Sequence, residues 1–547
     1  MNALVGASLD WMFRAMAGKF LKQAKQANSI SRRTLEQIIQ LNGSSQWGRE
    51  HGLAGPNAWE AFQRLPVHTY DEFSPYVERA ANGEAGVLTS EPLTYFAVTS
   101  GTTGPQKLIP VTKRQTRTIM NTMLAPIGLA SQAGLIGPIR GRYLHIQTEQ
   151  ISGTTPGGIP KGAATSGGLR AMGPVMGLIW TSPYPVLQIQ NQETARYLHL
   201  LFALGEERLW ALVAFFPSTL LYVFRDLHRR SEELLRDLAD GTITADLELD
   251  AAVRQQLTAM RRPNPERARH LSRLLEQGRF TAKDIWPHCG VVFTAASGTF
   301  RFYVEQLEPY LGGVPVFSSI YGASEATVGI GLPDREGYVI VPFSAYFEFL
   351  PVQGGDRLLS LQEVEEGVEY EVVLTNYAGL WRYRLGDQIR VVGRYGEAPI
   401  VEFLQRKGVG ISMVGEKTSE SQIGLAFGAA CRRVGASVTD YLVTPDPETT
   451  PGRYLLLVEA DPPVVPALLE AFHDELQRTA PRYGAAVRLG NIGPMGAWIL
   501  RPGAFERYRE ERVRAGASAS QVKVPHVIPD PAAARRHFAN EVIFAHE

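Results

Sequence analysis

A short run of small polar residues that ends in a lysine carries the clearest chemistry: Thr99-Ser100-Gly101-Thr102-Thr103-Gly104-Pro105-Gln106-Lys107. It follows an apolar segment, 93–98, which is typical of a strand. The glycines permit close backbone approach, successive N–H groups can form an anion-binding concavity, and Lys107 adds a mobile positive charge. The run predicts a polyphosphate loop, although its spacing is not that of a Walker A loop. On composition alone, a surface turn is the equal alternative.

Two further places put polar or small residues at the end of an apolar segment. Thr294 and Ala295 end the segment 291–294, and small side chains there leave room for a flat ring outside the carboxyl end of a strand. Tight strand–helix packing is the alternative. Glu325 follows the segment 314–319, and a single carboxylate beside phosphate oxygens suits Mg²⁺. A surface carboxylate at a helix start is the alternative there.

Several cationic residues are candidates for binding an anion. Arg382 and Arg384 alternate with apolar residues, which predicts that both point to one face of a strand. Either could bind a phosphate or a substrate carboxylate, and an ordinary ion pair is the equal alternative. Lys417 and Lys523 are candidates for stabilising a highly anionic phosphate, although an unselected lysine is more often a solvated surface charge.

The elements that must position these residues predict more than one domain, because 547 residues exceed one ordinary core. Strands alternate with helices up to about residue 317, which predicts an α/β architecture with a largely parallel sheet. Closely spaced strands over 345–401 predict an antiparallel β subdomain. Thr112 with Gln115 resembles a capping box at a helix start. We expect a large domain over 1–405, a hinge over 406–418 and a small α+β domain over 419–547.

Composition excludes several classes of protein. Lys+Arg and Asp+Glu are equal at 55 each, which argues against a nucleic-acid binder. Two cysteines, Cys289 and Cys431, argue against a disulfide scaffold or a cysteine-based zinc site. No apolar run is long enough to span a membrane. The N-terminal 26 residues have an amphipathic pattern unlike that of a signal peptide. We therefore expect a cytoplasmic enzyme without a membrane or nucleic-acid partner.

The loop at 99–107 resembles the phosphate loop of adenylate-forming enzymes, such as acyl-CoA synthetases, peptide-synthetase adenylation domains and luciferases. Over nearly its whole length the chain resembles the auxin-responsive Gretchen Hagen family of acyl acid amido synthetases, as a bacterial-type member. The resemblance is carried by short runs in a fixed order: Pro66-Val67-His68-Thr69-Tyr70-Asp71, Tyr76-Val77-Glu78-Arg79, Asp284-Ile285-Trp286-Pro287, Tyr321-Gly322-Ala323-Ser324-Glu325, Ala345-Tyr346-Phe347-Glu348-Phe349-Leu350-Pro351, Tyr377-Ala378-Gly379-Leu380-Trp381-Arg382-Tyr383-Arg384-Leu385-Gly386-Asp387, Gly415-Glu416-Lys417-Thr418 and Gly516-Ala517-Ser518-Ala519-Ser520-Gln521-Val522-Lys523-Val524-Pro525.

The resemblance implies roles for individual residues. Tyr321 and the Thr294 segment would lie near adenine. Asp387 would accept hydrogen bonds from the ribose diol, and Glu325 would bind Mg²⁺. Lys523 and Lys417 would be the catalytic lysines. The full nucleotide-binding set would be Thr99, Ser100, Gly101, Thr102, Thr103, Lys107, Thr294, Ala295, Tyr321, Gly322, Ala323, Ser324, Glu325, Asp387 and Lys417. His526 departs from the family, which usually has arginine there.

We expect the acyl pocket to be apolar and to involve Met172, Val175, Met176, Ile179 and Val328, although these residues equally suit plain core packing. The implied reaction uses ATP and Mg²⁺ to activate a small carboxylic acid as acyl-AMP, which then acylates an amine, expected to be an amino acid. The alternatives are an acyl-CoA ligase and a non-catalytic adenylate-binding protein. We expect a monomer with a large adenylate-forming α/β domain and a small α+β domain.

Overall fold

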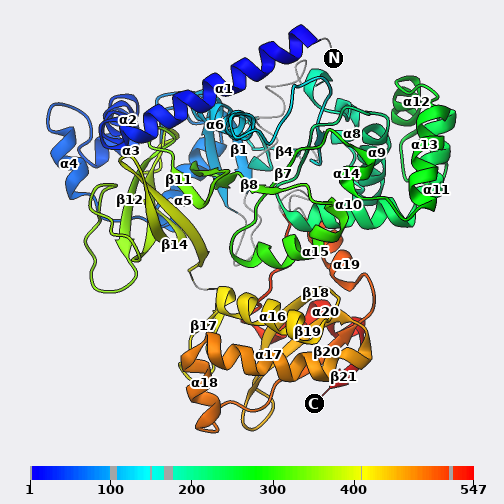
Figure 1. The fold of residues 1–547 in the computed structure, drawn as a ribbon. Coiled ribbons are helices and arrows are strands. Elements are labelled where there is room, and N and C mark those ends of the chain that lie inside the picture. The colour runs from blue at the N-terminus through cyan, green and yellow to red at the C-terminus, as the bar shows by residue number, and fades with distance from the viewer. Residues whose placement is uncertain are drawn as a thin grey trace. The chain divides into compact units, whose positions relative to one another are not determined.

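The structure, a computed structural model, describes residues 3–98, 107–147, 151–164, 177–407, 409–515 and 522–546. These residues form two compact units (Figure 1). The larger unit includes the described residues up to Phe403, and the smaller unit includes the described residues from Leu404 onward. The division falls inside strand β15 (Ala398–Arg406).

Helices begin the larger unit. The long helix α1 (Ala3–Lys25) packs along α6 (Lys113–Gln132), as Figure 1 shows. The Thr69 N–H donates to the Glu72 carboxylate at 2.6 Å and closes a capping box at the start of α5 (Tyr70–Ala81). The other helices of this region are α2 (Ala27–Asn42), α3 (Gln46–Glu50) and α4 (Ala58–Arg64).

A parallel sheet confirms the predicted α/β architecture. Its strand order is β3-β6-β7-β8 and every neighbouring pair is parallel. The strands are β3 (Leu144–His145), β6 (Ala211–Val213), β7 (Val291–Thr294) and β8 (Val316–Ser318). Helices connect them, as parallel strands require: α8 (Tyr184–Leu187), α9 (Gln192–Leu204), α10 (Pro217–Arg229), α11 (Ser231–Asp240), α12 (Ala251–Ala259), α13 (Pro265–Glu276), α14 (Ala282–Ile285) and α15 (Arg301–Leu311).

A second four-stranded sheet has the order β2-β1-β5-β4. Its strands are β1 (Leu93–Val98), β2 (Leu108–Thr112), β4 (Ile151–Thr154) and β5 (Pro160–Gly162). β1 and β2 are antiparallel, with Val98 opposite Leu108. The predicted phosphate loop, 99–107, therefore connects two neighbouring strands.

The predicted antiparallel subdomain is a seven-stranded sheet with the order β12-β13-β14-β15-β11-β10-β9. Besides β15 it contains β9 (Ile320–Gly322), β10 (Thr327–Leu332), β11 (Arg335–Ile340), β12 (Tyr346–Pro351), β13 (Glu369–Thr375) and β14 (Tyr383–Tyr395). The sheet is larger than the expected 345–401 region because β9, β10 and β11 join it. Tyr321 lies inside strand β9, which follows β8 in the chain.

The smaller unit is α+β, as predicted. Its sheet has the order β18-β19-β20-β21, and α16 (Glu420–Val434) and α17 (Val465–Thr479) lie side by side (Figure 1). The strands are β18 (Val438–Asp446), β19 (Arg453–Ala460), β20 (Gly496–Leu500) and β21 (Val542–His546). A hairpin, β16 (Gly410–Ile411) with β17 (Thr418–Ser419), precedes α16. The remaining helices are α18 (Pro481–Arg488), α19 (Ala504–Arg514) and α20 (Pro531–Phe538).

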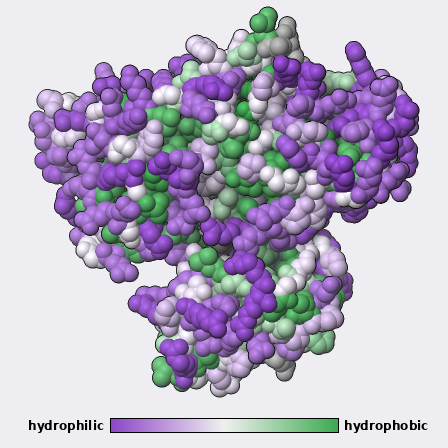
Figure 2. Space-filling model, in the orientation of Figure 1, coloured by the Kyte–Doolittle hydropathy of each residue, from purple (hydrophilic) through white to green (hydrophobic). Residues whose placement is uncertain are grey.

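The face of the molecule drawn in Figure 2 is mostly hydrophilic. Among the large apolar side chains with high exposure, Leu4 and Trp11 lie on α1, Leu489 follows α18 and Phe544 lies in β21. Among the helices that the structure describes, none is long and apolar enough to cross a lipid bilayer.

Candidate functional site

A buried hydrogen bond joins two of the predicted nucleotide-binding residues. The Tyr321 hydroxyl, on β9, donates to Asp387 Oδ2, on β14, at 2.8 Å. Neither residue is more than 9% exposed. Gly386 precedes Asp387 with φ +85°, at a place where the pairing of β13 and β14 shifts register. The glycine allows this local bend in the strand, which a residue with a Cβ would resist. The contact brings together residues that lie 66 positions apart.

The turn that carries Glu325 is fixed from two sides. It connects β9 to β10, and the Ala323 N–H donates to the Ala326 carbonyl at 2.9 Å. The Glu325 carbonyl accepts from Gln115 Nε2 at 2.8 Å and from Asn376 Nδ2 at 3.1 Å. Glu325 is 4% exposed, so the alternative of a surface carboxylate at a helix start is wrong.

The contact with Glu325 also corrects the predicted capping box at α6. Thr112 Oγ1 accepts from the Gln115 N–H at 3.2 Å, as a capping box requires. The Gln115 side chain, however, donates to Glu325 and does not return to the helix start. Only half of the box is formed, because the glutamine satisfies a buried carbonyl elsewhere.

Tyr70 interacts with two of the predicted site residues: Lys107 lies over its ring, and the charge of Glu325 acts on its hydroxyl. Lys107 Nζ lies 5.1 Å from the centre of the Tyr70 ring, a cation–π distance. The Tyr70 hydroxyl accepts from the Leu108 N–H at 2.9 Å, which fixes the start of β2 beside Lys107. Burial raises the pKa of Tyr70, and the negative charge of Glu325 adds to the rise. Thr99, Ser100, Gly101, Thr102 and Thr103 lie outside the described residues.

The carboxyl ends of the parallel strands carry a group of hydroxyls. Thr294 is 3% exposed at the end of β7, and its Oγ1 has no hydrogen-bond partner within the described part of the chain. The next residue, Ala295, donates its N–H to the Phe215 carbonyl at 3.2 Å. Ser318 Oγ accepts from the Ala296 N–H at 3.0 Å and lies 2.6 Å from the Tyr338 hydroxyl. A buried hydroxyl without a partner is costly unless a ligand or water completes it.

The predicted acyl residues are not brought together by the described structure. Ile179 is 4% exposed and packs in an apolar cluster with Trp180. Val328 is fully buried in β10 and belongs to a different cluster, which includes Tyr321. Met172, Val175 and Met176 lie outside the described residues. The acyl pocket therefore remains a prediction.

Both arginine candidates form ion pairs, which agrees with the alternative interpretation of these residues. Arg382 contacts both carboxylate oxygens of buried Glu348, at 2.8 and 3.0 Å. Arg384 contacts both oxygens of Glu371. The expectation that both arginines share one face of a strand is also wrong. Arg382 precedes β14 and has a left-handed backbone, with φ +41°.

The smaller unit carries both lysine candidates. Lys417 is exposed and lies directly before β17, whereas Lys523 is half-buried in the segment 522–528. The His526 N–H donates to Glu420 Oε1 at 3.2 Å, and the Val443 N–H donates to the His526 carbonyl at 2.8 Å. Glu420 stands three residues after Lys417, and His526 stands three residues after Lys523. The two lysine-bearing segments are thus joined to each other.

His526, which departs from the family's usual arginine, is part of the core of the smaller unit. It is 2% exposed and stacks on Tyr441 with 4.1 Å between ring centres. Its Nε2 lies 3.5 Å from Oδ1 of the fully buried Asp440.

The two cysteines differ in burial. Cys289 is fully buried, and burial raises the pKa of its thiol to about 12. Cys431 is half-buried on α16. Among the residues described, no three His, Cys, Asp or Glu side chains gather in a way that could hold a metal ion.

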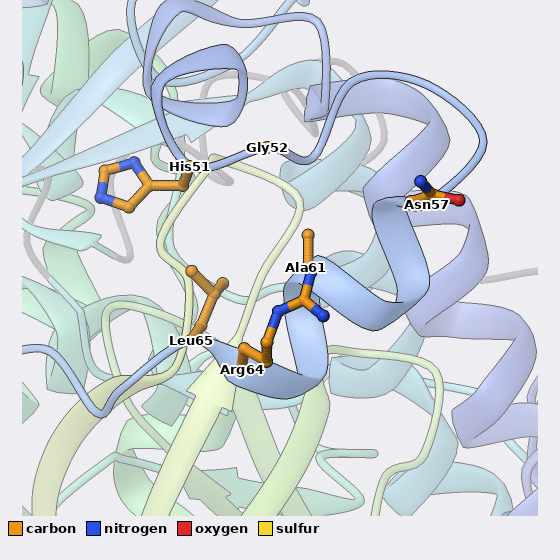
Figure 3. A pocket seen from close by; sticks show the side chains of 6 residues that line it. All are labelled: His51, Gly52, Asn57, Ala61, Arg64 and Leu65. Atoms are coloured by element: carbon orange, nitrogen blue, oxygen red, sulfur yellow. The ribbon is translucent and has the colours of Figure 1, made fainter.

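A surface pocket of about 270 Å³ lies around α4 and the turn before it, and it contains none of the predicted site residues (Figure 3). It is lined by His51, Gly52, Asn57, Ala61, Arg64 and Leu65. The His51 ring is half-buried and stacks on Trp47 with 3.7 Å between ring centres. The polar side chains of Asn57 and Arg64 are exposed, and the pocket is assigned no role.

The sequence did not indicate three residues that contact the candidate site: Gln115, Asn376 and Tyr338. Asn376 Oδ1 accepts from the Ala378 and Leu380 N–H groups and so shapes the turn before Trp381. All three act through backbone carbonyls or hydroxyls of other elements. The only available signal was that Asn376 and Gln115 are polar residues beside recognised motifs.

Comparison with solved structures shows the class of protein. A 2-hydroxyisobutyryl-CoA ligase, solved in a postadenylation state with its acyl-AMP, aligns over 97% of this chain and 91% of its own at 14% identity, with a TM-score of 0.52. The fold is therefore that of adenylate-forming ligases. The GH3.15 acyl acid amido synthetase is far more similar: it aligns over 97% of both chains at 26% identity, with a TM-score of 0.85.

Sequence comparison shows the family. The GH3 family N-terminal domain matches residues 16–316, the central domain residues 338–406 and the C-terminal domain residues 421–532. Indole-3-acetic acid-amido synthetase GH3.8 of Oryza sativa subsp. indica is 31% identical over 92% of this chain and 89% of its own. GH3.5 of Arabidopsis thaliana, another indole-3-acetic acid-amido synthetase, is 29% identical over the same shares.

The chain belongs to the GH3 family, which is the Gretchen Hagen family that the motifs indicated. It is an ATP-dependent ligase of the acyl acid amido synthetase class. Both named relatives are plant proteins, so they give no support to the expected bacterial type.

Proposed function

We propose that this enzyme activates an apolar carboxylic acid with ATP and transfers the acyl group to the amino group of an amino acid. The observation that carries the proposal is the Tyr321–Asp387 hydrogen bond, because it unites two separate nucleotide motifs in one buried contact. The hydroxyl of Thr294, buried without a partner among the described residues, adds a donor at the carboxyl end of the parallel sheet.

In the first step, a carboxylate oxygen of the acid attacks the α-phosphorus of ATP. The new P–O bond forms while the bond to pyrophosphate breaks, which leaves acyl-AMP. Lys523 and Lys417 are proposed to neutralise the negative charge that develops on the phosphate. Asp387 holds the ribose, and Tyr321 orients Asp387. These residues mainly position the reactants and balance charge.

We propose Mg²⁺ as the metal that accompanies ATP, with Glu325 as its protein ligand. A hard cation with phosphate and water ligands needs few carboxylates from the protein, and Glu325 is held at its carbonyl by Gln115 and Asn376. When bound, Mg²⁺ would offset the charge of the phosphates. Because its backbone is fixed, Glu325 presents its carboxylate with little freedom.

In the second step, the amine nitrogen attacks the acyl carbonyl. The C–N bond forms, the C–O bond to AMP breaks, and the nitrogen loses a proton. A mixed anhydride is reactive, so the protein has mainly to orient the amine and to exclude water. We propose that residues 406–418 act as a hinge about which the small domain, 419–547, moves relative to the large domain, 1–405, between the two steps.

We propose that the acyl pocket is apolar and takes an aromatic or aliphatic acid. Ile179 and Val328 are apolar in the described structure, and Met172, Val175 and Met176 are apolar in the sequence. Indole-3-acetic acid is named for the relatives, and one solved GH3.15 structure contains 2,4-DB. These two acids are therefore suitable first probes. A monomeric, cytoplasmic enzyme is part of the same proposal.

The function is tested by ATP–pyrophosphate exchange with a panel of carboxylic acids, followed by AMP release with each amino acid. We expect acid-dependent exchange, and amide formation without coenzyme A. Product formation that requires coenzyme A would favour an acyl-CoA ligase. Absence of exchange with every acid, despite ATP binding, would favour a non-catalytic adenylate-binding protein.

The sharpest single variant is Lys523→Ala. Removing the charge at the pentavalent phosphate should lower the rate of pyrophosphate exchange by about 100-fold or more, while the Kd for ATP changes little. The controls are Lys523→Arg, which keeps the charge, and Lys19→Ala on the exposed surface of α1. Unchanged exchange in Lys523→Ala would remove Lys523 from the mechanism.

A further inference from the structure

Lys417 has an unusual backbone conformation. Its φ is +51°, and among the non-glycine residues that the structure describes only Arg382 shares a positive φ. For an L-residue this left-handed conformation is unfavourable, because Cβ crowds the following carbonyl oxygen. Such strain persists only where surrounding contacts enforce it, and it is frequent at functional sites. The contacts of the neighbouring residues should therefore show what enforces this conformation of Lys417.

Glu416, directly before Lys417, fixes the turn from inside. It is 4% exposed, and its carboxylate accepts from the Met413 and Val414 N–H groups, each at 2.9 Å. These are charge-assisted hydrogen bonds between neighbours in one turn. The turn is closed at its base by pairing of Ile411 with Thr418.

Tyr454, on β19, connects both neighbours of Lys417. Its hydroxyl lies 2.8 Å from Glu416 Oε1 and 2.8 Å from Thr418 Oγ1. The phenol is fully buried, and its ring packs against Tyr483 with 4.9 Å between ring centres. Residues 416 and 418 are thus held on one fixed group, which leaves the residue between them little choice of φ.

The phenol is suited to this bridge at any ordinary pH. Burial raises the pKa of Tyr454, and the charge of Glu416 adds to the rise, so the hydroxyl keeps its proton. A carboxylate is the stronger acceptor, so this proton goes to Glu416. The other groups that face the phenol are the Thr418 hydroxyl and the Ile411 carbonyl, which do not titrate, and Tyr483, whose own pKa is raised by burial.

We propose that Tyr454 is a positioning residue for Lys417: by bridging Glu416 and Thr418, it holds Lys417 in the left-handed conformation with its ammonium directed outward. This inference rests on the proposed role of Lys417 at the nucleotide phosphate. Glu416 and Thr418 are buried while Lys417 is exposed. Within the described residues, the Lys417 side chain makes no ion pair or hydrogen bond. Its direction is therefore set by its backbone, and a relaxed φ would turn Cβ elsewhere.

The test compares Tyr454→Phe with the matched control Tyr483→Phe. Both remove one hydroxyl from a buried ring of the smaller unit, but the Tyr483 hydroxyl pairs with His473 and not with the turn. Glu416→Gln is the second variant. In hydrogen exchange of the peptide 410–419, Tyr454→Phe and Glu416→Gln should exchange about tenfold faster than the unchanged protein. Tyr483→Phe should leave this peptide unchanged.

The link to catalysis is measured by pyrophosphate exchange with ATP and indole-3-acetic acid as the first probe acid, or another acid that the panel identifies. Tyr454→Phe should lower kcat about tenfold and change the KM for ATP less than about twofold. In a Lys417→Ala background, which should itself be about 100-fold slower, Tyr454→Phe should add less than about a further twofold. A residue that serves stability alone would lower both backgrounds equally.

Two results would overturn the inference. The first is unchanged hydrogen exchange of 410–419 in Tyr454→Phe. The second is an equal loss of kcat with and without Lys417. If no acid supports exchange in the unchanged protein, the proposed function fails, whereas hydrogen exchange at Met413 and Val414 still decides whether Tyr454 holds the turn.

Discussion

The Asp387 carboxylate, which we propose to bind the ribose, accepts a hydrogen bond from the Tyr321 hydroxyl. Tyr321 donates to Oδ2. Because the carboxylate is planar and rigid, this hydrogen bond also orients the other oxygen, Oδ1. A carboxylate has several acceptor positions, so one hydrogen bond from Tyr321 leaves capacity for a ribose diol. At the scale of single residues, Tyr321 of one motif therefore orients Asp387 of another.

Tyr321→Phe tests this relation. Loss of the donor should raise the KM for ATP about tenfold and lower the free energy of unfolding by about 1 kcal/mol, because a buried carboxylate loses one hydrogen bond. Pyrophosphate-exchange kinetics and urea unfolding measure the two effects. The control is Tyr377→Phe, which removes the hydroxyl of another buried tyrosine that contacts Gln37. An unchanged KM would show that Asp387 needs no help from Tyr321.

The sequence indicates candidate site residues but not the residues that fix their positions. Glu325 and Asp387 stand in contiguous motifs, which is why the sequence names them as candidates. Gln115 and Asn376 hold the Glu325 carbonyl. Every residue has a backbone carbonyl, so the sequence does not show which polar side chain will donate to a particular one. Arg382 and Arg384 show the opposite error: ion pairing with Glu348 and Glu371 depends on distant strands that local alternation cannot reveal.

At the scale of elements, the start of α19 is held by a buried carboxylate from a neighbouring strand. Glu459, on β19, accepts from the Gly503 N–H at 3.0 Å and from the Phe505 N–H at 2.7 Å. Free N–H groups at a helix start favour an anion. Burial nevertheless raises the pKa of Glu459, against the opposing effect of the two backbone donors.

The raised pKa of Glu459 predicts a pH-dependent stability. Because the pKa is raised on folding, the contribution of Glu459 is fully present below the usual glutamate value of 4.5 and is lost as pH rises through the folded-state pKa. Glu459→Gln should remove the effect. Relative to the variant, the unchanged protein should lose unfolding free energy as the pH rises above 4.5. Urea unfolding at a series of pH values measures it, and a pH-independent difference would contradict it.

Element boundaries were predictable where a helix or strand was long and its ends carried local signals. The strand Leu93–Val98 was recognised from its apolar segment, and the start of α6 from the capping signal at Thr112. β3 and β6 have only two and three residues, too few for periodicity to detect. The joining of β9, β10 and β11 to the antiparallel sheet depends on long-range pairing, such as Tyr338 with Val401, which local pattern does not encode.

At the scale of the whole molecule, the two units have separate apolar cores. One core of the larger unit contains Phe73, Val328 and Trp381, whereas that of the smaller unit contains Leu455, Phe505 and Phe538. A residue inside one core should therefore stabilise that unit and affect the other much less.

His526→Ala tests this independence. Loss of the imidazole beside buried Asp440 should destabilise the smaller unit by about 3 kcal/mol, which hydrogen exchange would report as faster exchange in β18 and β19 alone. The reciprocal control is His199→Ala, because His199 is buried in the larger unit against Ser182 and Gln147. Equal acceleration in both units would show that they unfold together.

The hydrogen bond from the His526 N–H to Glu420 ties the segment of Lys417 to that of Lys523. If the smaller unit moves between the two steps, as proposed, both lysines move together. The nucleotide would then gain or lose both positive charges at the same time. The kinetic response to added salt should accordingly be that of a divalent group, with no stage at which only one lysine has arrived.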